Sequence, residues 1–152
     1  MRVIKITRKD AIKSSERIKV ENDNIKGSIN LEGGVIDDIS FKKHKKNLEN
    51  NLNVEFLNPE ETENGFYIET GWTSVGNKIK VPSRKSKWKI SGNKFLKENS
   101  PILLEWSNGE NIVFKKKIEI DNKYLFKITQ QVYNNSNKTI ELYPYAQITR
   151  NK

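Results

Sequence analysis

The feature of this sequence that most restricts its fold is a series of alternating apolar and polar residues between Ile102 and Arg150. In the middle run, Tyr124, Phe126, Ile128 and Val132 fall on one side of a period-two ribbon, and Lys127, Thr129 and Gln131 fall on the other. Side chains of a β-strand point alternately to the two faces of a sheet, so a period of two predicts strands with one buried face. Three such runs in succession, separated by polar turns, predict a β-meander in which each strand pairs with the next.

The first two runs of this series carry clear turn signals. Asn108-Gly109 tolerates the positive φ angles of a type I′ turn and predicts that the strand 102–106 pairs with the strand that starts at Ile112. The run 112–120 has Ile and Phe at alternate positions. We interpret its three consecutive lysines, at positions 115–117, as a charged strand face that discourages edge pairing.

The remainder of the chain also consists of short apolar runs bounded by turn residues. This gives eight or nine strands about ten residues apart, which is typical of an antiparallel sandwich or barrel. We therefore predict an all-β fold, an antiparallel β-sandwich, with loops at 42–53 and 92–100. The remaining predicted strands lie at 25–31, 35–41, 54–57, 66–72, 75–81 and 87–91.

Length and composition limit the possible functions. A chain of 152 residues suits one domain. The net charge of +9 would suit a nucleic acid or an anionic lipid surface, but lysines are spread along the chain and arginines number five. Lys, Asn and Ile all have A/T-rich codons, so genomic base composition explains the bias and nucleic-acid binding is not expected. Without cysteine, disulfides and thiol chemistry are excluded.

The N-terminal 23 residues are predicted to be a leader or linker, and residues 24–152 to form the domain. Residues 7–18 could form a short frayed helix. Arg2 and Lys5 interrupt the first apolar residues, so no signal peptide is expected. No run approaches the roughly 20 apolar residues that a membrane-spanning helix requires.

The sequence offers few candidates for chemistry. His44 is surrounded by lysines, so we interpret it as part of a solvated basic loop rather than as a base or metal ligand. Asp37-Asp38 could bind calcium or serve as an acid–base pair, but neighbouring side chains of a strand point to opposite faces. A strand-end or turn role is therefore predicted. We expect no catalytic residue, no metal site and no cofactor.

Large aromatic residues form the remaining candidate site. They could line a groove for a sugar, a peptide or a partner protein, because flat rings stack on apolar surfaces, or they could pack in the core. The segment Leu142-Tyr143-Pro144-Tyr145 breaks the alternation with a proline, which predicts a strand edge or a bulge. The candidate groove residues are Trp72, Trp88, Trp106, Tyr143 and Tyr145.

An ordered set of short segments resembles the large periplasmic domain of the YidC family of membrane protein insertases in Gram-negative bacteria. The resemblance runs from about Asn24 to Arg150, and Thr7 to Arg17 resembles the tether that follows the family's first membrane helix. The matching segments include Gly27-Ser28-Ile29-Asn30-Leu31, Gly33-Gly34, Ile36-Asp37-Asp38, Glu69-Thr70-Gly71-Trp72, Val81-Pro82, Leu104-Glu105-Trp106, Tyr124-Leu125-Phe126 and Leu142-Tyr143-Pro144-Tyr145.

The resemblance implies a β-supersandwich similar to galactose mutarotases, on the periplasmic face of the bacterial inner membrane. It implies a non-catalytic domain of an insertase that assists the insertion and folding of inner-membrane proteins, alone or with the Sec translocon. Substrate proteins and Sec subunits are the implied partners. The catalytic His and Glu of the mutarotases find no counterpart. The alternative is a sugar-binding, mutarotase-like sandwich protein.

The family's domain continues beyond the Leu-Tyr-Pro-Tyr segment. We therefore expect an incomplete sandwich, with an exposed sheet edge or apolar face near its last strands.

Overall fold

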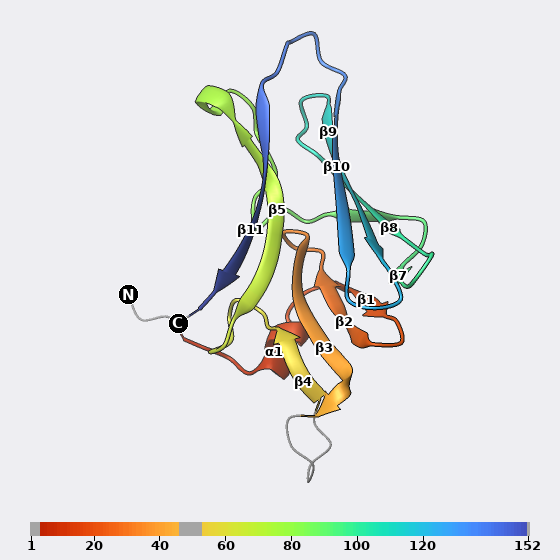
Figure 1. The fold of residues 1–152 in the computed structure, drawn as a ribbon. Helices are drawn as coiled ribbons and strands as arrows, with labels where there is room; N and C mark the ends of the chain where they lie inside the picture. The colour runs from red at the N-terminus through yellow and green to blue at the C-terminus, as the bar shows by residue number, and fades with distance from the viewer. Residues whose placement is uncertain (1–3, 46–52, 152) are drawn as a thin grey trace.

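The structure is a computed structural model and describes residues 4–45 and 53–151. Most of these residues lie in β-strands. They form two sheets that face each other (Figure 1). The elements are α1 (Arg8–Lys13), β1 (Arg17–Glu21), β2 (Ile25–Asn30), β3 (Val35–Lys45), β4 (Asn53–Leu57), β5 (Phe66–Ser74), the 3-10 turn η1 (Val75–Asn77), β6 (Lys89–Ser91), β7 (Phe95–Leu96), β8 (Ile102–Ser107), β9 (Ile112–Ile120), β10 (Phe126–Asn134) and β11 (Leu142–Arg150).

One sheet has seven strands in the order β11-β5-β3-β2-β1-β7, with β4 paired to β3, and the other has four in the order β10-β9-β8-β6. Pairing is antiparallel throughout except between β1 and β7. The predicted all-β antiparallel sandwich is confirmed. No helix in the described ranges is long and apolar enough to span a membrane.

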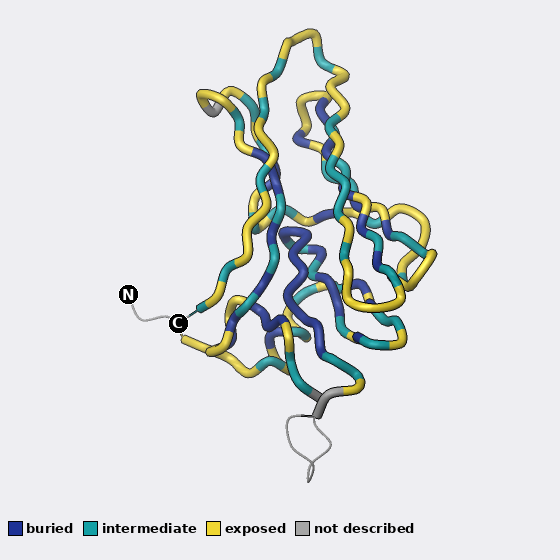
Figure 2. The backbone as a smooth tube through the Cα atoms, in the orientation of Figure 1, coloured by how far each residue is buried: buried dark blue, intermediate teal, exposed yellow. Residues whose placement is uncertain are grey.

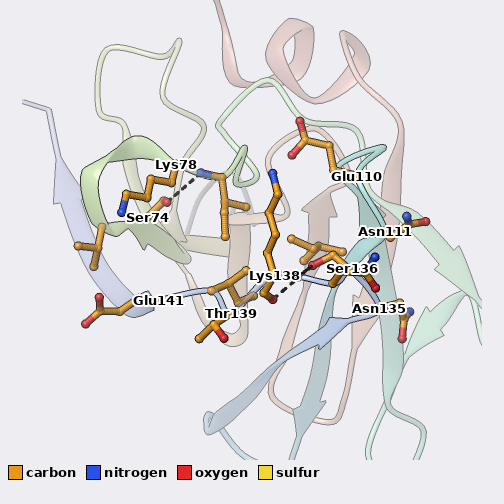
Figure 3. Close-up of a pocket in the computed structure, with 14 residues that line it drawn as sticks. Ser74, Lys78, Glu110, Asn111, Asn135, Ser136, Lys138, Thr139 and Glu141 are labelled. Carbon is orange, nitrogen blue, oxygen red and sulfur yellow. Dashed lines mark hydrogen bonds between the residues drawn. The ribbon is translucent and has the colours of Figure 1, made fainter.

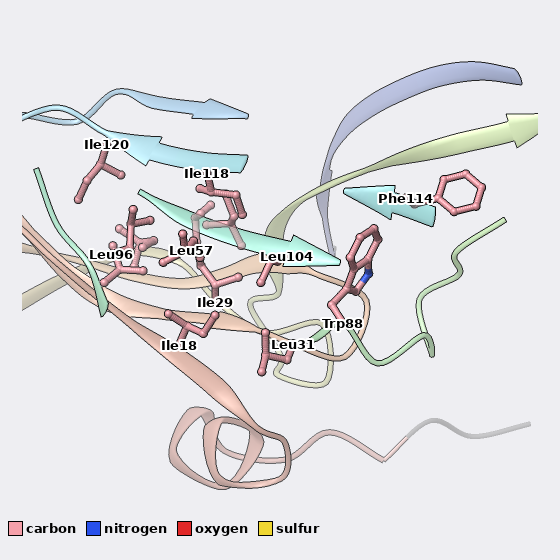
Figure 4. Close-up of a cluster of buried hydrophobic side chains, with 14 of the residues drawn as sticks. Ile18, Ile29, Leu31, Leu57, Trp88, Leu96, Leu104, Phe114, Ile118 and Ile120 are labelled. Atoms are coloured by element: carbon pink, nitrogen blue, oxygen red, sulfur yellow. The ribbon is translucent and has the colours of Figure 1, made fainter. Parts of the chain in front are cut away.

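The core lies between the sheets, and burial decreases towards the loops and the outer strands (Figure 2). Alternate residues of β9 supply its centre from the small sheet: Ile112, Phe114, Ile118 and Ile120 are all buried. They meet buried residues of the large sheet such as Ile29 (Figure 4). The period-two pattern thus identified the buried face of this strand correctly.

The predicted meander is only partly correct. Strands β8, β9 and β10 are hairpin neighbours, but β11 does not pair with β10. The chain crosses to the other sheet, and β11 pairs with β5 from Leu142 opposite Ser74 to Arg150 opposite Phe66. An alternating pattern specifies which face of a strand is buried, but it does not specify which strand becomes its neighbour.

Three smaller predictions are wrong. Residues 42–45 continue β3 instead of opening a loop, while 46–52 lie outside the described residues. The predicted strand 75–81 is replaced by η1, which turns at Gly76 with φ of 67°. In the β8–β9 turn the positive φ angles fall on Gly109 and Asn111, so the turn is not type I′.

The N-terminal segment contains regular structure. Thr7 caps α1, its Oγ1 accepting a hydrogen bond from the Asp10 amide at 3.2 Å. Strand β1 then pairs with β2 over five residues, and its Ile18 and Val20 are buried in the core. Residues 17–21 therefore belong to the large sheet.

The pairing of β2 with β3 contains a β-bulge. Ser28 lies opposite Asp38, but Ile29 lies opposite Ile36, so Asp37 is an extra residue on β3. The bulged strand passes so close to β2 that a Cβ on Gly27 would lie 1.8 Å from the Asp38 carbonyl oxygen. Position 27 can therefore hold only glycine without a backbone shift.

We predict that Gly27→Ala destabilises the chain by about 3 kcal/mol or more, because β3 would have to move away from β2. Gly92→Ala is the control. Its added Cβ would meet nothing within 4 Å, so its cost is limited to the positive φ of 78°, about 1 kcal/mol. Urea unfolding followed by tryptophan fluorescence measures both, and equal losses would contradict the steric account.

Candidate functional site

The acidic pair Asp37-Asp38 lies on one face of the sheet, contrary to the prediction that the two side chains point to opposite faces. The bulge turns the extra residue, Asp37, towards the same side as Asp38. Arg17 forms a two-pronged pair with Asp37 at 2.6 and 3.1 Å. Arg8 of α1 reaches Asp38 at 2.6 Å, and Ser28 donates to the same carboxylate at 2.6 Å.

These carboxylates attach the N-terminal segment to the sheet. Figure 4 shows α1 on the side of the large sheet that faces away from the core. Burial raises the pKa of Asp37, although the hydrogen bond and charge of Arg17 lower it. Arginine and serine donors occupy the carboxylate oxygens, so the pair has a structural role. Within the described ranges, no group of three or more His, Cys, Asp or Glu could hold a metal ion.

We predict that Arg17→Met costs about 3–5 kcal/mol, because it leaves the Asp37 carboxylate buried without its cation. The matched control on the same strand is Lys19→Met. Lys19 forms an exposed pair with Glu21 at 3.7 Å, whose loss should cost at most about 1 kcal/mol. Urea titrations at pH 7 measure the loss of unfolding free energy for both variants. Similar losses would contradict the larger contribution expected of the buried pair.

The five aromatic residues considered as candidates for a groove do not share one surface. Trp72 and Trp88 are buried and stack with ring centroids 6.3 Å apart. Trp106 also joins the core, with its ring 5.8 Å from that of Phe114. On β11, Tyr143 is 59% exposed, whereas Tyr145 is half-buried and lies across Gly71. Buried tryptophans offer no free ring face to a ligand.

The structure places a lysine inside the sandwich. Of the three consecutive lysines of β9, predicted to form a charged face, Lys116 is 1% exposed and lies in the inward row between Phe114 and Ile118. The predicted charged face is therefore wrong for this residue, while Lys117 is exposed. The strand alternation itself was the available signal, since positions 112, 114, 116, 118 and 120 share one face.

Lys116 and its cross-strand neighbour Gln130 connect the two sheets. The Lys116 ammonium donates to the Thr70 carbonyl at 2.8 Å, and the Gln130 amide donates to the Gly71 carbonyl at 3.1 Å. Burial lowers the pKa of Lys116 from 10.5 to about 7; Glu69 opposes this shift and Arg84 adds to it. A buried amine that loses its proton near neutral pH is a candidate functional group.

A cavity of about 810 Å³ lies beside the β10–β11 loop, which crosses from one sheet to the other. Three segments line it: the end of β5 with η1, the β8–β9 turn, and the loop 135–141 (Figure 3). Lys78, Lys138, Glu110 and Glu141 give it a mixed charge. Its size would admit a small ligand or a side chain.

Three aromatic rings from different elements form a cluster that we call the aromatic patch: the partly buried Phe41 and the exposed Phe56 and Tyr124, together with the neighbouring Leu125. The Phe41 ring is 5.3 Å from that of Phe56 and 5.6 Å from that of Tyr124. Tyr124 is 48% exposed and Leu125 66% exposed. Phe41, Val54, Phe56 and Tyr124 surround a shallow apolar pocket of about 590 Å³.

The turn that carries Tyr124 and Leu125 is held in place by the neighbouring β1–β2 turn. The Asn22 amide donates to the carbonyls of Asp121 and Lys123 at 2.9 and 2.8 Å, and Asn24 donates to the carbonyl of Asn122 at 2.6 Å. The exposed apolar side chains therefore extend from a braced turn. Sequence reasoning missed this patch, because its residues come from three separate segments.

The histidine and the charged residues around Arg84 form no shared site. His44 lies near the end of β3. Glu60 pairs with Arg84, which also lies 3.5 Å from Glu69 and stacks on the Tyr67 ring at 4.9 Å. These contacts tie the loop that carries Arg84 to β5 and give no catalytic arrangement.

Taken together, the fold and these surfaces define an antiparallel β-sandwich domain with contact surfaces as its candidate sites. Residues 17–152 match the family model described as the YidC periplasmic domain. The chain belongs to the YidC family, as the sequence resemblance implied.

Curated relatives agree over nearly the whole chain. It is 39% identical over 148 residues to the membrane protein insertase YidC of Pelagibacter ubique (strain HTCC1062), covering 97% of this chain and 26% of that protein. The corresponding protein of Brucella suis biovar 1 is 32% identical over 146 residues, and that of Bradyrhizobium diazoefficiens 34% over 147. The chain thus spans about a quarter of the length of these relatives.

Proposed function

We propose that this chain serves as a non-catalytic periplasmic domain of a membrane protein insertase. The match of residues 17–152 to the family's periplasmic domain carries this proposal. Residues 24–152 form the N-terminal part of that domain, residues 1–23 lead into it, and β1 within that leader adds a strand to the sheet. The domain lies on the periplasmic face of the inner membrane.

The domain acts as a scaffold and contact surface during the insertion and folding of inner-membrane proteins. Its partners are those substrate proteins and subunits of the Sec translocon. The net charge of +9 supports additional contact with the anionic lipid surface. The curated relatives are named membrane protein insertases, which supports substrates with long apolar segments.

The aromatic patch is the surface best suited to such substrates. Exposed aromatic and aliphatic side chains bury apolar area when an apolar segment binds. The hydrogen bonds from Asn22 and Asn24 brace the turn before binding, so little conformational freedom is lost on association.

Site-specific photo-crosslinking tests this function. A photoreactive residue replaces Tyr124 or Leu125 in the complete insertase. Membranes that contain this variant are then supplied with ribosomes that synthesise a single-span inner-membrane protein. We expect adducts with the nascent protein or with Sec subunits. The matched control position is Lys97, which is exposed in the loop between β7 and β8. No adducts, or equal adducts from position 97, would contradict the assigned surface.

A second measurement separates this function from sugar binding. Calorimetric titration of the chain with a panel of hexoses should give no saturable heat. Saturable binding of a hexose would instead support the mutarotase-like alternative.

A further inference from the structure

Lys116 lies in the row of β9 side chains that faces the core, and the other residues of this row are apolar. Its neighbours on the inward row of β9 are Phe114 and Ile118, both fully buried. The other buried cationic side chain, that of Arg17, is neutralised by Asp37, whereas Lys116 has no such partner among the described residues. A charge at this depth is costly unless an opposite charge or several hydrogen bonds compensate for it.

The compensation available to Lys116 is small. Its ammonium has three donors, and one of them binds the Thr70 carbonyl at 2.8 Å. The Trp88 ring, 4.8 Å from the ammonium, adds a cation–π contact but accepts no conventional hydrogen bond from the other two donors. A Cβ on Gly34 would lie 3.3 Å from the Lys116 nitrogen and 3.2 Å from the Trp88 indole nitrogen, so the β2–β3 turn closes the site tightly. In the described chain, no carboxylate lies within 4.0 Å of the ammonium.

The charged groups around the site come from several elements. Glu69 on β5 favours the protonated amine, but its carboxylate already binds Arg84 and Gln147. Arg84, from the loop before β6, disfavours the protonated amine. Tyr145 on β11 is neutral near pH 7, since burial and Glu69 raise its pKa. The neighbour on β10, Gln130, carries no charge.

We propose that Lys116 is a proton-controlled joint between the two sheets. The neutral amine allows β9 to remain packed against β5 and the β2–β3 turn. Protonation creates a cation that needs more hydrogen bonds than Thr70 alone provides, and water can supply them only if this contact loosens. In the acid form, β9 and β10 therefore separate locally from β5, next to Trp88.

The direction of the pH effect follows from the two states of the chain. In the unfolded chain the lysine has its usual pKa of 10.5, and in the folded chain burial lowers the pKa to about 7. Between these values the unfolded chain binds one more proton than the folded chain, so stability rises with pH. The unfolding equilibrium constant should fall by up to about tenfold per pH unit in this interval, and the full destabilisation persists below pH 7.

Nuclear magnetic resonance on the unaltered chain tests the titration directly. The ¹³Cε signal of Lys116 should titrate with a midpoint near 7. A Lys116 signal that shows no titration near neutral pH overturns the proposal.

Hydrogen exchange tests the conformational consequence. After correction for intrinsic rates, amides of β9 and β10 should exchange at least tenfold faster at pH 6 than at pH 8.5. Lys116→Met should remove this difference, and the exposed neighbour Lys117→Met should retain it. Equal protection at both pH values in the unaltered chain overturns the joint. The two measurements on the unaltered chain decide the question even if Lys116→Met does not fold.

Discussion

The contact between Phe114 and the tryptophans of the sandwich is the interaction on which the rest of the structure depends. The Phe114 ring lies 4.9 Å from that of Trp72 on β5 and 5.8 Å from that of Trp106 on β8. Trp72 in turn stacks on Trp88. Large rings packed at these distances set the separation of the two sheets, because close-packed cores do not tolerate gaps or overlap.

The position of β5 shows why this contact matters. Strand β5 joins the rest of the large sheet through the pair of Ile68 with Ile36, while β11 pairs with β5 along its whole length. The second half of β5 is therefore held by the other sheet, through Trp72 and the carbonyls of Thr70 and Gly71. Loosening the contact between β9 and β5 would therefore remove a support of β5, β11 and one wall of the cavity beside them. The aromatic patch lies at the far end of the same strands, because Tyr124 and Leu125 belong to the turn between β9 and β10, and the Phe56 ring lies 5.9 Å from that of Phe66 on β5.

The strands and their buried faces could be predicted from the sequence, since a period of two depends only on local geometry. The pairing of the strands could not be predicted, because β11 pairs with a strand about 75 residues earlier in the chain. The carboxylates of Asp37 and Asp38 show a second limit: a single extra residue in β3 reverses the rule that adjacent side chains diverge. The aromatic patch joins residues from three segments, and no local pattern indicates that they meet.

Lys116 shows where two sequence rules conflict. Its residue type favours the surface, whereas its place in the alternation of β9 favours the core, and the structure follows the alternation. A wholly apolar inward row could slide by two residues against the facing sheet and still bury similar side chains. In this chain, such a slip would remove the Lys116 amine and the Gln130 amide from the carbonyls of Thr70 and Gly71. Each buried polar group left without a partner costs about 1–3 kcal/mol. These two hydrogen bonds therefore favour one register of β9 and β10 on β5. Because one of the two donors is the Lys116 amine, this register also depends on the protonation of that amine.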